Sequence, residues 1–425
     1  MTEFDVKVRL CFLYFLFANI FWKGYNLYRK MNRGGAMIKS SARKYKDYVI
    51  NLRKELHENP GLSWEEYGAS EIIKRELTAM GLSYREMAKT GVVVDIKGNY
   101  EGGCVLLRAD MDALPVTECT NVSYKSKNEG KMHACGHDGH TAQLLGAVKV
   151  LNKNRDLIHG TVRCVFQPAE EIGQGAKKMI EEGVLEGVDG AFAIHLWSGI
   201  PVGKISAEAG PRMASADNFL IKIIGKGGHG SLPQQCVDPV VTASAFVMNL
   251  QPIVSRETNP NESIVITVGK IHTGTTANVI PNEAVIEGTA RCFNPELRKE
   301  IPHMIERVLK GTVEIYRADY EMDYKFYPAP VINDTACTET AVKSAVKLYG
   351  KECLFSLEKM TTAEDFSAFS EKVPSVLAFV GVRNEEKECV YPHHHPKFNM
   401  DEDGFETGTA LYAQYAVDFL NSLEK

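Results

Sequence analysis

Side chains that bind metal ions are concentrated in five short stretches of the sequence. Two aspartates stand in 108–112 (RADMD), and three histidines and a cysteine stand in 133–140 (HACGHDGH). The other stretches are the pair Glu170–Glu171, the single His195 and the run 393–395 (HHH). Imidazole and carboxylate bind zinc, manganese and nickel, and a thiolate suits the softer of these ions. The combination predicts a site for divalent metal ions.

Hydrolysis is the chemistry that such a site would support. Two ions a few ångströms apart can polarise a carbonyl group and lower the pKa of a bound water. A separate carboxylate must then carry a proton from that water to the leaving amine. The pair Glu170–Glu171 fits this division, because one glutamate can bind metal while its neighbour acts as the general base.

Each stretch also has a purely structural explanation when it is taken alone. The two aspartates could cap a loop, Cys135 could be a small buried apolar side chain, and Glu170–Glu171 could be the charged start of a helix. His195 could be a buried, hydrogen-bonded histidine, and 393–395 could be a solvated loop. Together these explanations become weak, because all five stretches follow strands or lie in loops and little else in the chain carries such side chains.

Alternating strands and helices must position these side chains. The segments 104–110, 161–171 and 190–196 are apolar runs that become polar at their ends, as buried parallel strands do. Helical periodicity marks segments between them, such as 140–154. The carboxyl ends of parallel strands meet at one edge of a sheet, so the side chains can converge. The pattern predicts an α/β fold with helices on both faces of a mainly parallel sheet.

A different order of elements occupies 214–327. It reads strand, helix, strand, strand, helix, strand, which is the order of a ferredoxin-like module. The α/β pattern then returns with a helix at 338–348 and an apolar strand at 373–382. We therefore expect a catalytic domain split into 37–213 and 328–425, with the α+β module inserted into it.

Composition and charge exclude several classes of function. The 425 residues include 49 basic and 54 acidic side chains, and a net charge of −5 does not favour a nucleic-acid partner. The ten cysteines form no C-x-x-C pair and no regular framework, which favours reduced thiols in a cytoplasmic protein.

The first 36 residues differ from the remainder of the chain. The apolar run 10–22 is shorter than the roughly 20 residues that a spanning helix needs. Glu3 and Asp5 precede it, where a signal peptide carries positive charge. We interpret residues 1–36 as an N-terminal extension from an upstream start, with the domain beginning at Met37. The alternative is weak membrane association through 10–22.

The motifs resemble those of a known enzyme family. RADMDALP, MHACGHDGHTA, FQPAEE, the isolated His195 and HHHPKF are similar to motifs of the M20 metallopeptidases, over the chain from about Met37 to its end. The similarity is to the amidohydrolase subgroup that includes hippurate hydrolases, auxin-conjugate hydrolases and N-acetyldiaminopimelate deacetylases. It implies two divalent ions per subunit, manganese, zinc, nickel or cobalt. It also implies that the inserted module is a lid and dimerisation domain, and hence a homodimer.

The resemblance assigns roles to individual positions. It implies these metal ligands: Cys135, His137, Glu171, His195 and His394. Glu170 matches the general base, and Asp112 matches a carboxylate that supports a metal-binding histidine. His229 matches a histidine that stabilises the oxyanion, and Asn278 matches a residue that contacts substrate. The family's ligand stands two residues before the proline, which selects His394, although His393 occupies a position that is more usually apolar.

We therefore expect an enzyme that hydrolyses N-acyl amino acids to a carboxylate and a free amino acid. One alternative is an aminopeptidase, carboxypeptidase or dipeptidase on the same scaffold. Another is a non-catalytic metal-binding protein, which the presence of Glu170 beside Glu171 disfavours. The acyl group, the amino acid and the native metal stay open, as does whether His229 acts in its own subunit or across a dimer.

Overall fold

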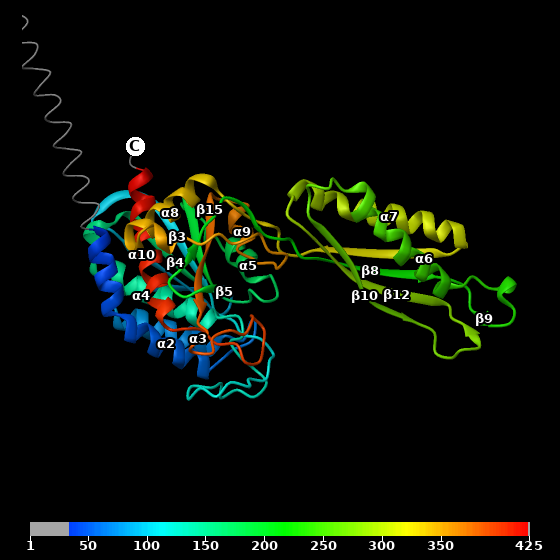
Figure 1. The fold of residues 1–425 in the computed structure, drawn as a ribbon, viewed down its shortest axis with the longest axis horizontal. Helices are drawn as coiled ribbons and strands as arrows, with labels where there is room; N and C mark the ends of the chain where they lie inside the picture. Colours follow the sequence, from blue (N-terminus) through cyan, green and yellow to red (C-terminus); the bar gives the residue numbers. More distant parts are fainter. Residues whose placement is uncertain (1–33, 424–425) are drawn as a thin grey trace, which may run out of the picture.

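The computed structural model describes residues 34–423, and it shows two bodies side by side (Figure 1). Residues 34–44 are already helical, so ordered secondary structure begins before Met37. The apolar run 10–22 lies outside the described residues. Within the described part, no helix combines the length and apolar character needed to cross a membrane. The cytoplasmic location stays a prediction.

The larger body is built on a seven-stranded sheet with the order β1-β2-β4-β3-β5-β15-β6. Four central strands run parallel: β4 (His159–Gln167), β3 (Tyr100–Asp110), β5 (Gly190–Pro201) and β15 (Ser375–Arg383). Three outer strands are antiparallel to their neighbours: β1 (Tyr84–Met87), β2 (Gly91–Lys97) and β6 (Ile205–Ser206). Because β15 pairs with β5, segments before and after the insertion share one sheet.

Helices cover both faces of this sheet (Figure 1). One face packs against five helices: α2 (Lys46–Glu58), α3 (Tyr67–Ala79), α4 (His137–Lys153), α8 (Thr335–Tyr349) and α10 (Asp403–Leu423). The other face packs against two shorter helices: α5 (Gly175–Glu181) and α9 (Ser367–Ser370). Side chains of β3 alternate between the two cores, with Val105 and Leu107 in the first and Leu106 in the second.

The smaller body is the predicted ferredoxin-like module. Its antiparallel sheet has the order β10-β12-β8-β13 and packs on two helices around a separate core. The elements are β8 (Asp217–Ile224), α6 (Pro239–Pro252), β10 (Ile264–Thr273), β12 (Glu283–Cys292), α7 (Pro295–Tyr316) and β13 (Asp319–Phe326). The connecting segments pair beside it as β7 (Gly210–Met213) and β14 (Val331–Asn333). The domain limits at 214 and 327 stay predictions.

A two-stranded ribbon extends the smaller body at its far end. It consists of β9 (Gly228–His229) and β11 (Val279–Ile280), which pair antiparallel. The ribbon lies at the end of the molecule that points away from the catalytic body (Figure 1).

Two elements differ from the sequence prediction. Helix α4 begins at His137, three residues earlier than expected, so His137 and His140 lie in its first turn. Strand β5 continues to Pro201, so His195 lies inside the strand and not at its end. The reason is the pairing, because β15 accompanies β5 to Pro201 whereas β3 pairs with it only as far as Ala193.

Candidate metal centre

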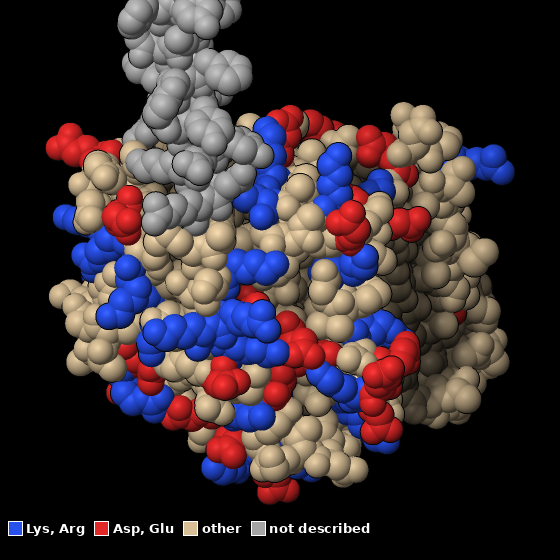
Figure 2. Space-filling view, turned by 60° about the vertical axis from the view of Figure 1, so that its left-hand side comes forward, with Lys and Arg blue, Asp and Glu red and all other residues tan. Residues whose placement is uncertain are grey.

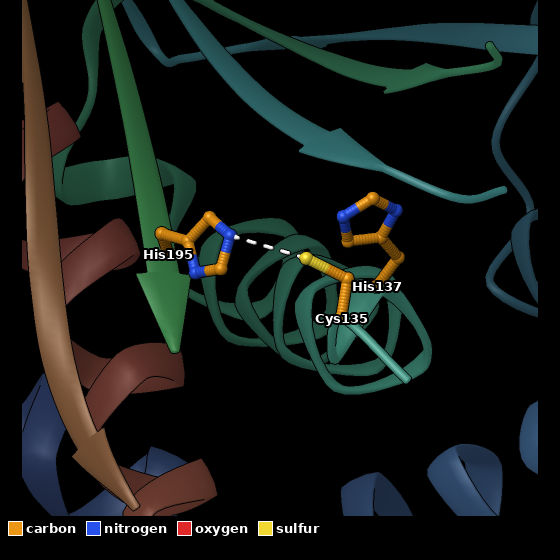
Figure 3. A group of neighbouring side chains, drawn as sticks. All are labelled: Cys135, His137 and His195. Carbon is orange, nitrogen blue, oxygen red and sulfur yellow. Dashed lines mark hydrogen bonds between the residues drawn. The ribbon is translucent and has the colours of Figure 1, made fainter. Parts of the chain in front are cut away.

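The stretches singled out in the sequence meet where β5 extends beyond β3. Figure 3 shows Cys135, which precedes α4, and His137, the first residue of α4, beside His195 on β5. The turn after β4 adds Glu170 and Glu171, and a loop before α10 adds His394. A cavity of about 620 Å³ opens at this place, and five of these side chains line it: Cys135, Glu170, Glu171, His195 and His394.

Two groups of possible ligands share the thiol of Cys135. In the first group Cys135, His137 and His195 bring their ligand atoms within 4.8 Å of one another. In the second, Cys135, Glu171 and His394 do the same. The Sγ atom of Cys135 lies 3.7 Å from Nε2 of His195 (Figure 3), and Nε2 of His394 lies 3.6 Å from a Glu171 oxygen. Together the groups contain all five ligands that the resemblance implies.

Gly136 lets Cys135 and His137 project into the same site. It precedes α4 with φ +91°, a left-handed conformation that side chains other than glycine rarely adopt. A Cβ atom at this position would also lie 3.0 Å from the sulfur of Met400. The sharp turn therefore depends on glycine.

Hydrogen bonds fix which nitrogen each histidine presents. Nδ1 of His137 lies 3.0 Å from the carbonyl oxygen of Asp112, and Nδ1 of His195 lies 2.8 Å from that of Leu196. A carbonyl oxygen can only accept, so both Nδ1 atoms donate, and in the neutral ring that binds metal each Nε2 carries a lone pair. Nε2 of His137 is buried without a hydrogen-bond partner among the described residues. This arrangement is typical of metal-binding histidines.

The charges around these atoms fit a cation. Burial raises the pKa of Cys135 well above its usual value and the pKa of Glu171 to about 7. Burial opposes a charge on His137, but the carboxylate of Asp110 and next the sulfur of Cys135 in its thiolate form outweigh burial and hold the pKa of His137 well above its usual value. One oxygen of Glu171 is also buried and unpartnered among the described residues. Sulfur, nitrogen and oxygen donors with this excess of negative charge suit divalent zinc, manganese, nickel or cobalt.

His140 lies beside the ligands but has no free nitrogen. Its Nδ1 lies 2.6 Å from a carboxylate oxygen of Asp110, and its Nε2 accepts from the backbone N–H of Leu196 at 2.8 Å. Asp110, His137 and His140 have atoms close enough to hold an ion. Since both ring nitrogens of His140 already form hydrogen bonds, we propose that His140 orients Asp110.

The three consecutive histidines have three different environments. His393 stacks on Trp197, with ring centroids 4.4 Å apart, and its Nε2 donates to the carbonyl of Leu196 at 2.9 Å. His395 stacks on Tyr391. Among the described residues only His394 of the three belongs to a group of possible ligands.

Asp112 joins the two sides of the site. One carboxylate oxygen lies 3.2 Å from Nδ1 of His137, and the other accepts from the backbone N–H of Glu171 at 3.0 Å and from Ser63 at 2.7 Å. These contacts are those of a residue that orients ligands, which is the role that the resemblance implies for it.

Sequence reasoning missed Glu66, which holds the turn that carries the two glutamates. Its carboxylate accepts from the backbone N–H of Ala169 at 2.8 Å and from the hydroxyl of Thr90 at 2.6 Å. Ala169 has φ +54°, a strained conformation for alanine. No motif marks Glu66, because its partners lie far away in the sequence.

Glu170 lies beside the possible ligands with its carboxyl almost fully buried. It is 9% exposed, and one of its oxygens lies 4.0 Å from Nε2 of His137. Burial, and next the carboxylate of Glu364, raise the pKa of Glu170 well above its usual value. A raised pKa suits a group that must accept and return a proton near neutral pH.

His229 and Asn278 lie together, but away from the metal ligands. His229 pairs with Val279 in the ribbon, and the N–H of Gly230 donates to the carbonyl of Asn278 at 2.8 Å. A Cβ at Gly230 would lie 2.9 Å from that oxygen, so the close approach requires glycine. Neither His229 nor Asn278 lines the cavity of the metal site.

Residues 106–418 match the family described as peptidase family M20/M25/M40. The chain belongs to this family. It is 40% identical to thermostable carboxypeptidase 2 of Saccharolobus solfataricus, over 90% of this chain and 98% of that protein. It is 39% identical to N-acetylcysteine deacetylase of Bacillus subtilis, over 88% of this chain and 98% of that protein.

A solved structure of an M20 peptidase has the same fold. This dinuclear metal-binding peptidase of Bacillus subtilis superposes with a TM-score of 0.80 at 36% identity, covering 89% of this chain and 99% of that chain. The resemblance inferred from the motifs is therefore confirmed, and the chain is an M20 metal-dependent hydrolase. The names of its relatives refer to different amide substrates, so membership of the family does not by itself identify the substrate of this chain.

Proposed function

We propose that this M20 hydrolase cleaves N-acyl amino acids to a carboxylate and a free amino acid. Five side chains would hold two divalent cations: Cys135, His137, Glu171, His195 and His394. Cys135 belongs to both groups of possible ligands, so its thiolate would help to hold the cations. When bound, the cations would polarise the scissile carbonyl and acidify the attacking water.

Glu170 is the observation that carries the assignment of a hydrolase mechanism. Its carboxyl is close enough to His137 and Glu171 to share an ion with them, but it belongs to neither of the two groups that share Cys135. We therefore assign Glu170 to take the proton of the water and to deliver it to the leaving nitrogen. A metal-storage site has no need for a buried carboxyl with a raised pKa next to its ligands.

Arg291 supports a substrate with a free carboxylate. It is the one Lys or Arg side chain that lines the cavity within the described residues, and it forms no ion pair there. Its guanidinium reaches only the carbonyl of Thr361, at 3.4 Å. A guanidinium binds carboxylate through paired hydrogen bonds, so Arg291 can hold the α-carboxylate of the amino acid while the acyl group lies toward Trp197 and Met213.

We assign His229 to the oxyanion, acting in the cleft of a second subunit. The backbone N–H of Ser231 donates to Nδ1 of His229 at 3.1 Å, so the proton of the neutral ring lies on Nε2. The exposed ring can therefore donate a hydrogen bond away from its own ribbon. Its place at the far end of the smaller body supports a contribution across a homodimer, with Asn278 beside it (Figure 1).

The face in view in Figure 2 is not that of a protein that binds polyanions. Figure 2 shows Lys and Arg side chains interspersed with Asp and Glu over the face in view, with no large area of one sign. Polyanions such as nucleic acids bind to extended basic surfaces.

Carboxypeptidase activity is the second candidate, favoured by the name of one relative and by the size of the cavity. We suggest assaying N-acetyl, N-benzoyl and indoleacetyl amino acids beside free and N-blocked dipeptides, with manganese, zinc, nickel or cobalt. We expect release of the free amino acid from the N-acyl compounds, and little release when their carboxylate is amidated. Cleavage of dipeptides alone would replace the first assignment with the second.

The role of Arg291 can be tested with the same substrates. Arg291→Gln removes the positive charge, so we expect a higher KM for the acid but the same KM for its amide. An equal KM for the acid in both proteins would contradict recognition of a carboxylate by Arg291.

A further inference from the structure

A buried charged network lies directly behind Glu170 and holds none of the proposed ligands. Its centre is Arg108, at the end of β3 and 1% exposed. One Nη atom donates to Asp110 at 2.7 Å. The other donates to Glu364 at 2.9 Å and to Asp365 at 2.7 Å. One guanidinium therefore gathers three carboxylates, two of which come from a segment more than 250 positions later in the chain.

Gln167 closes this network into a ring. Nε of Arg108 donates to Oε1 of Gln167 at 2.8 Å, and Nε2 of Gln167 donates to both oxygens of Asp365 at 2.8 Å. The backbone N–H of Ala176 adds a bond to Asp365 at 2.9 Å. All three ring members are buried. Because burying charges is costly and seldom adds net stability, a role in the site explains the network better than stability does.

The ring contacts the proposed general base. Glu170 follows Gln167 by three positions, and its Oε1 lies 3.4 Å from the backbone nitrogen of Asp365, which donates to it. Oxygen atoms of Glu170, Glu364 and Asp365 all lie within 4.8 Å of one another. The same guanidinium holds Asp110, whose other oxygen bonds to His140. The network thus connects the base to the strand end that faces the ligands.

We propose that Arg108, Gln167 and Asp365 are positioning residues that fix the Glu170 carboxyl for proton transfer. The inference rests on the proposed function, because it takes Glu170 to be the general base. The ring anchors both the turn that carries Glu170 and the N–H group that bonds its carboxyl. Misplacement of a reacting group by about 1 Å costs about 10²-fold in rate. Loss of hydrogen bonds in this ring should therefore reduce kcat and leave metal content and KM unchanged.

Asp365→Asn is the principal test. The amide keeps the volume of the side chain but replaces one of its two acceptor oxygens with a donating group, which faces the donors of Arg108, Gln167 and Ala176. We expect kcat to fall about 10²-fold, while KM and the metal content of the purified holoenzyme stay unchanged. The matched control is Asp95→Asn, which breaks the pair with Arg163 (2.9 and 3.0 Å) on β2 and β4, away from the site. The control should keep the wild-type kcat.

A double-mutant cycle separates positioning from general damage. If Asp365 acts through Glu170, then Asp365→Asn should cost less than about twofold when Glu170 is already glutamine, because interacting residues are non-additive. An equal loss in both backgrounds, or a loss that follows lost metal, would overturn the proposal.

A second variant covers the case in which Asp365→Asn does not fold. Gln167→Met removes the bridging amide without leaving a charge unpaired, and we expect a smaller fall of kcat in the same direction. A wild-type kcat in folded, metal-replete Gln167→Met protein would also overturn the proposal. All variants are compared on whichever amide the wild-type enzyme cleaves, so failure of the proposed substrate class leaves this test intact.

Discussion

The two bodies present their functional side chains in opposite ways. In the catalytic body, Cys135, His137 and His195 are buried and already oriented by hydrogen bonds. In the smaller body, His229 is exposed on a ribbon, and within the described part of the chain its ring forms hydrogen bonds with Ser231 alone. We infer from this difference that one chain can complete the proposed metal centre by itself, whereas the proposed oxyanion donor would act in the cleft of a second subunit. Metal binding and catalysis are therefore expected to respond to different mutations.

Loss of the general base should have the largest effect and should leave the metal centre intact. Glu170→Gln keeps the shape of the side chain but cannot take a proton. We expect kcat to fall about 10²–10⁴-fold, with unchanged metal content by elemental analysis. Near-normal turnover at full metal occupancy would remove Glu170 from the mechanism.

A slightly smaller effect is expected in the smaller body. His229→Ala removes a hydrogen-bond donor worth roughly 2.7–4 kcal/mol, or about 10²–10³-fold in kcat, and metal content should not change. A loss confined to KM would point to substrate binding instead.

Mixing of variants would then locate the acting His229. His229→Ala and Glu170→Gln proteins are mixed under conditions that exchange subunits, and turnover is measured. Recovered activity is expected if the histidine serves a partner's cleft. No recovery after demonstrated exchange would place it in its own subunit.

Loss of the Cys135 thiol should lower metal affinity and should not act on proton transfer. Cys135→Ser replaces the atom that both ligand groups share. Changes merely beside a metal ligand cost about 10–10²-fold in metal affinity, so we expect a loss of about 10²-fold, measured by competition with a chelator. A serine variant with wild-type affinity would show that the sulfur is not a ligand.

Metal affinity should also depend on pH in a predictable direction. Burial raises the pKa of Glu171 to about 7, above its usual value. Below pH 7 the carboxyl is mostly protonated and must lose its proton to bind, so affinity should rise at least about tenfold per pH unit between pH 5 and 7. Affinity that is constant over this range would contradict a ligand role for Glu171.

The types of side chain that form the site could be predicted from the sequence, because they stand in short motifs. The spacing of Cys135 and His137, the pair Glu170–Glu171 and the order of the motifs are properties of short segments, and they indicated the M20 family that the comparisons confirm. Periodicity likewise predicted the α/β body and the inserted module, since hydrophobic patterns reflect which faces are buried. The individual ligand assignments stay predictions.

Only the tertiary structure decided which of these side chains are free to act. The resemblance implied a ligand role for His195 and not for His140, and the structure supplies a physical reason. Asp110 and the backbone N–H of Leu196 occupy both nitrogens of His140, whereas Nε2 of His195 faces the thiol of Cys135. The position of His195 inside β5 depends on strand pairing with residues nearly two hundred positions away. Glu66, Arg291 and Asp365 stand in no motif. Arg108 and Gln167 do stand in motifs, but nothing in the sequence indicates their partners, because hydrogen bonds between distant segments are set by packing and leave no local pattern in the chain.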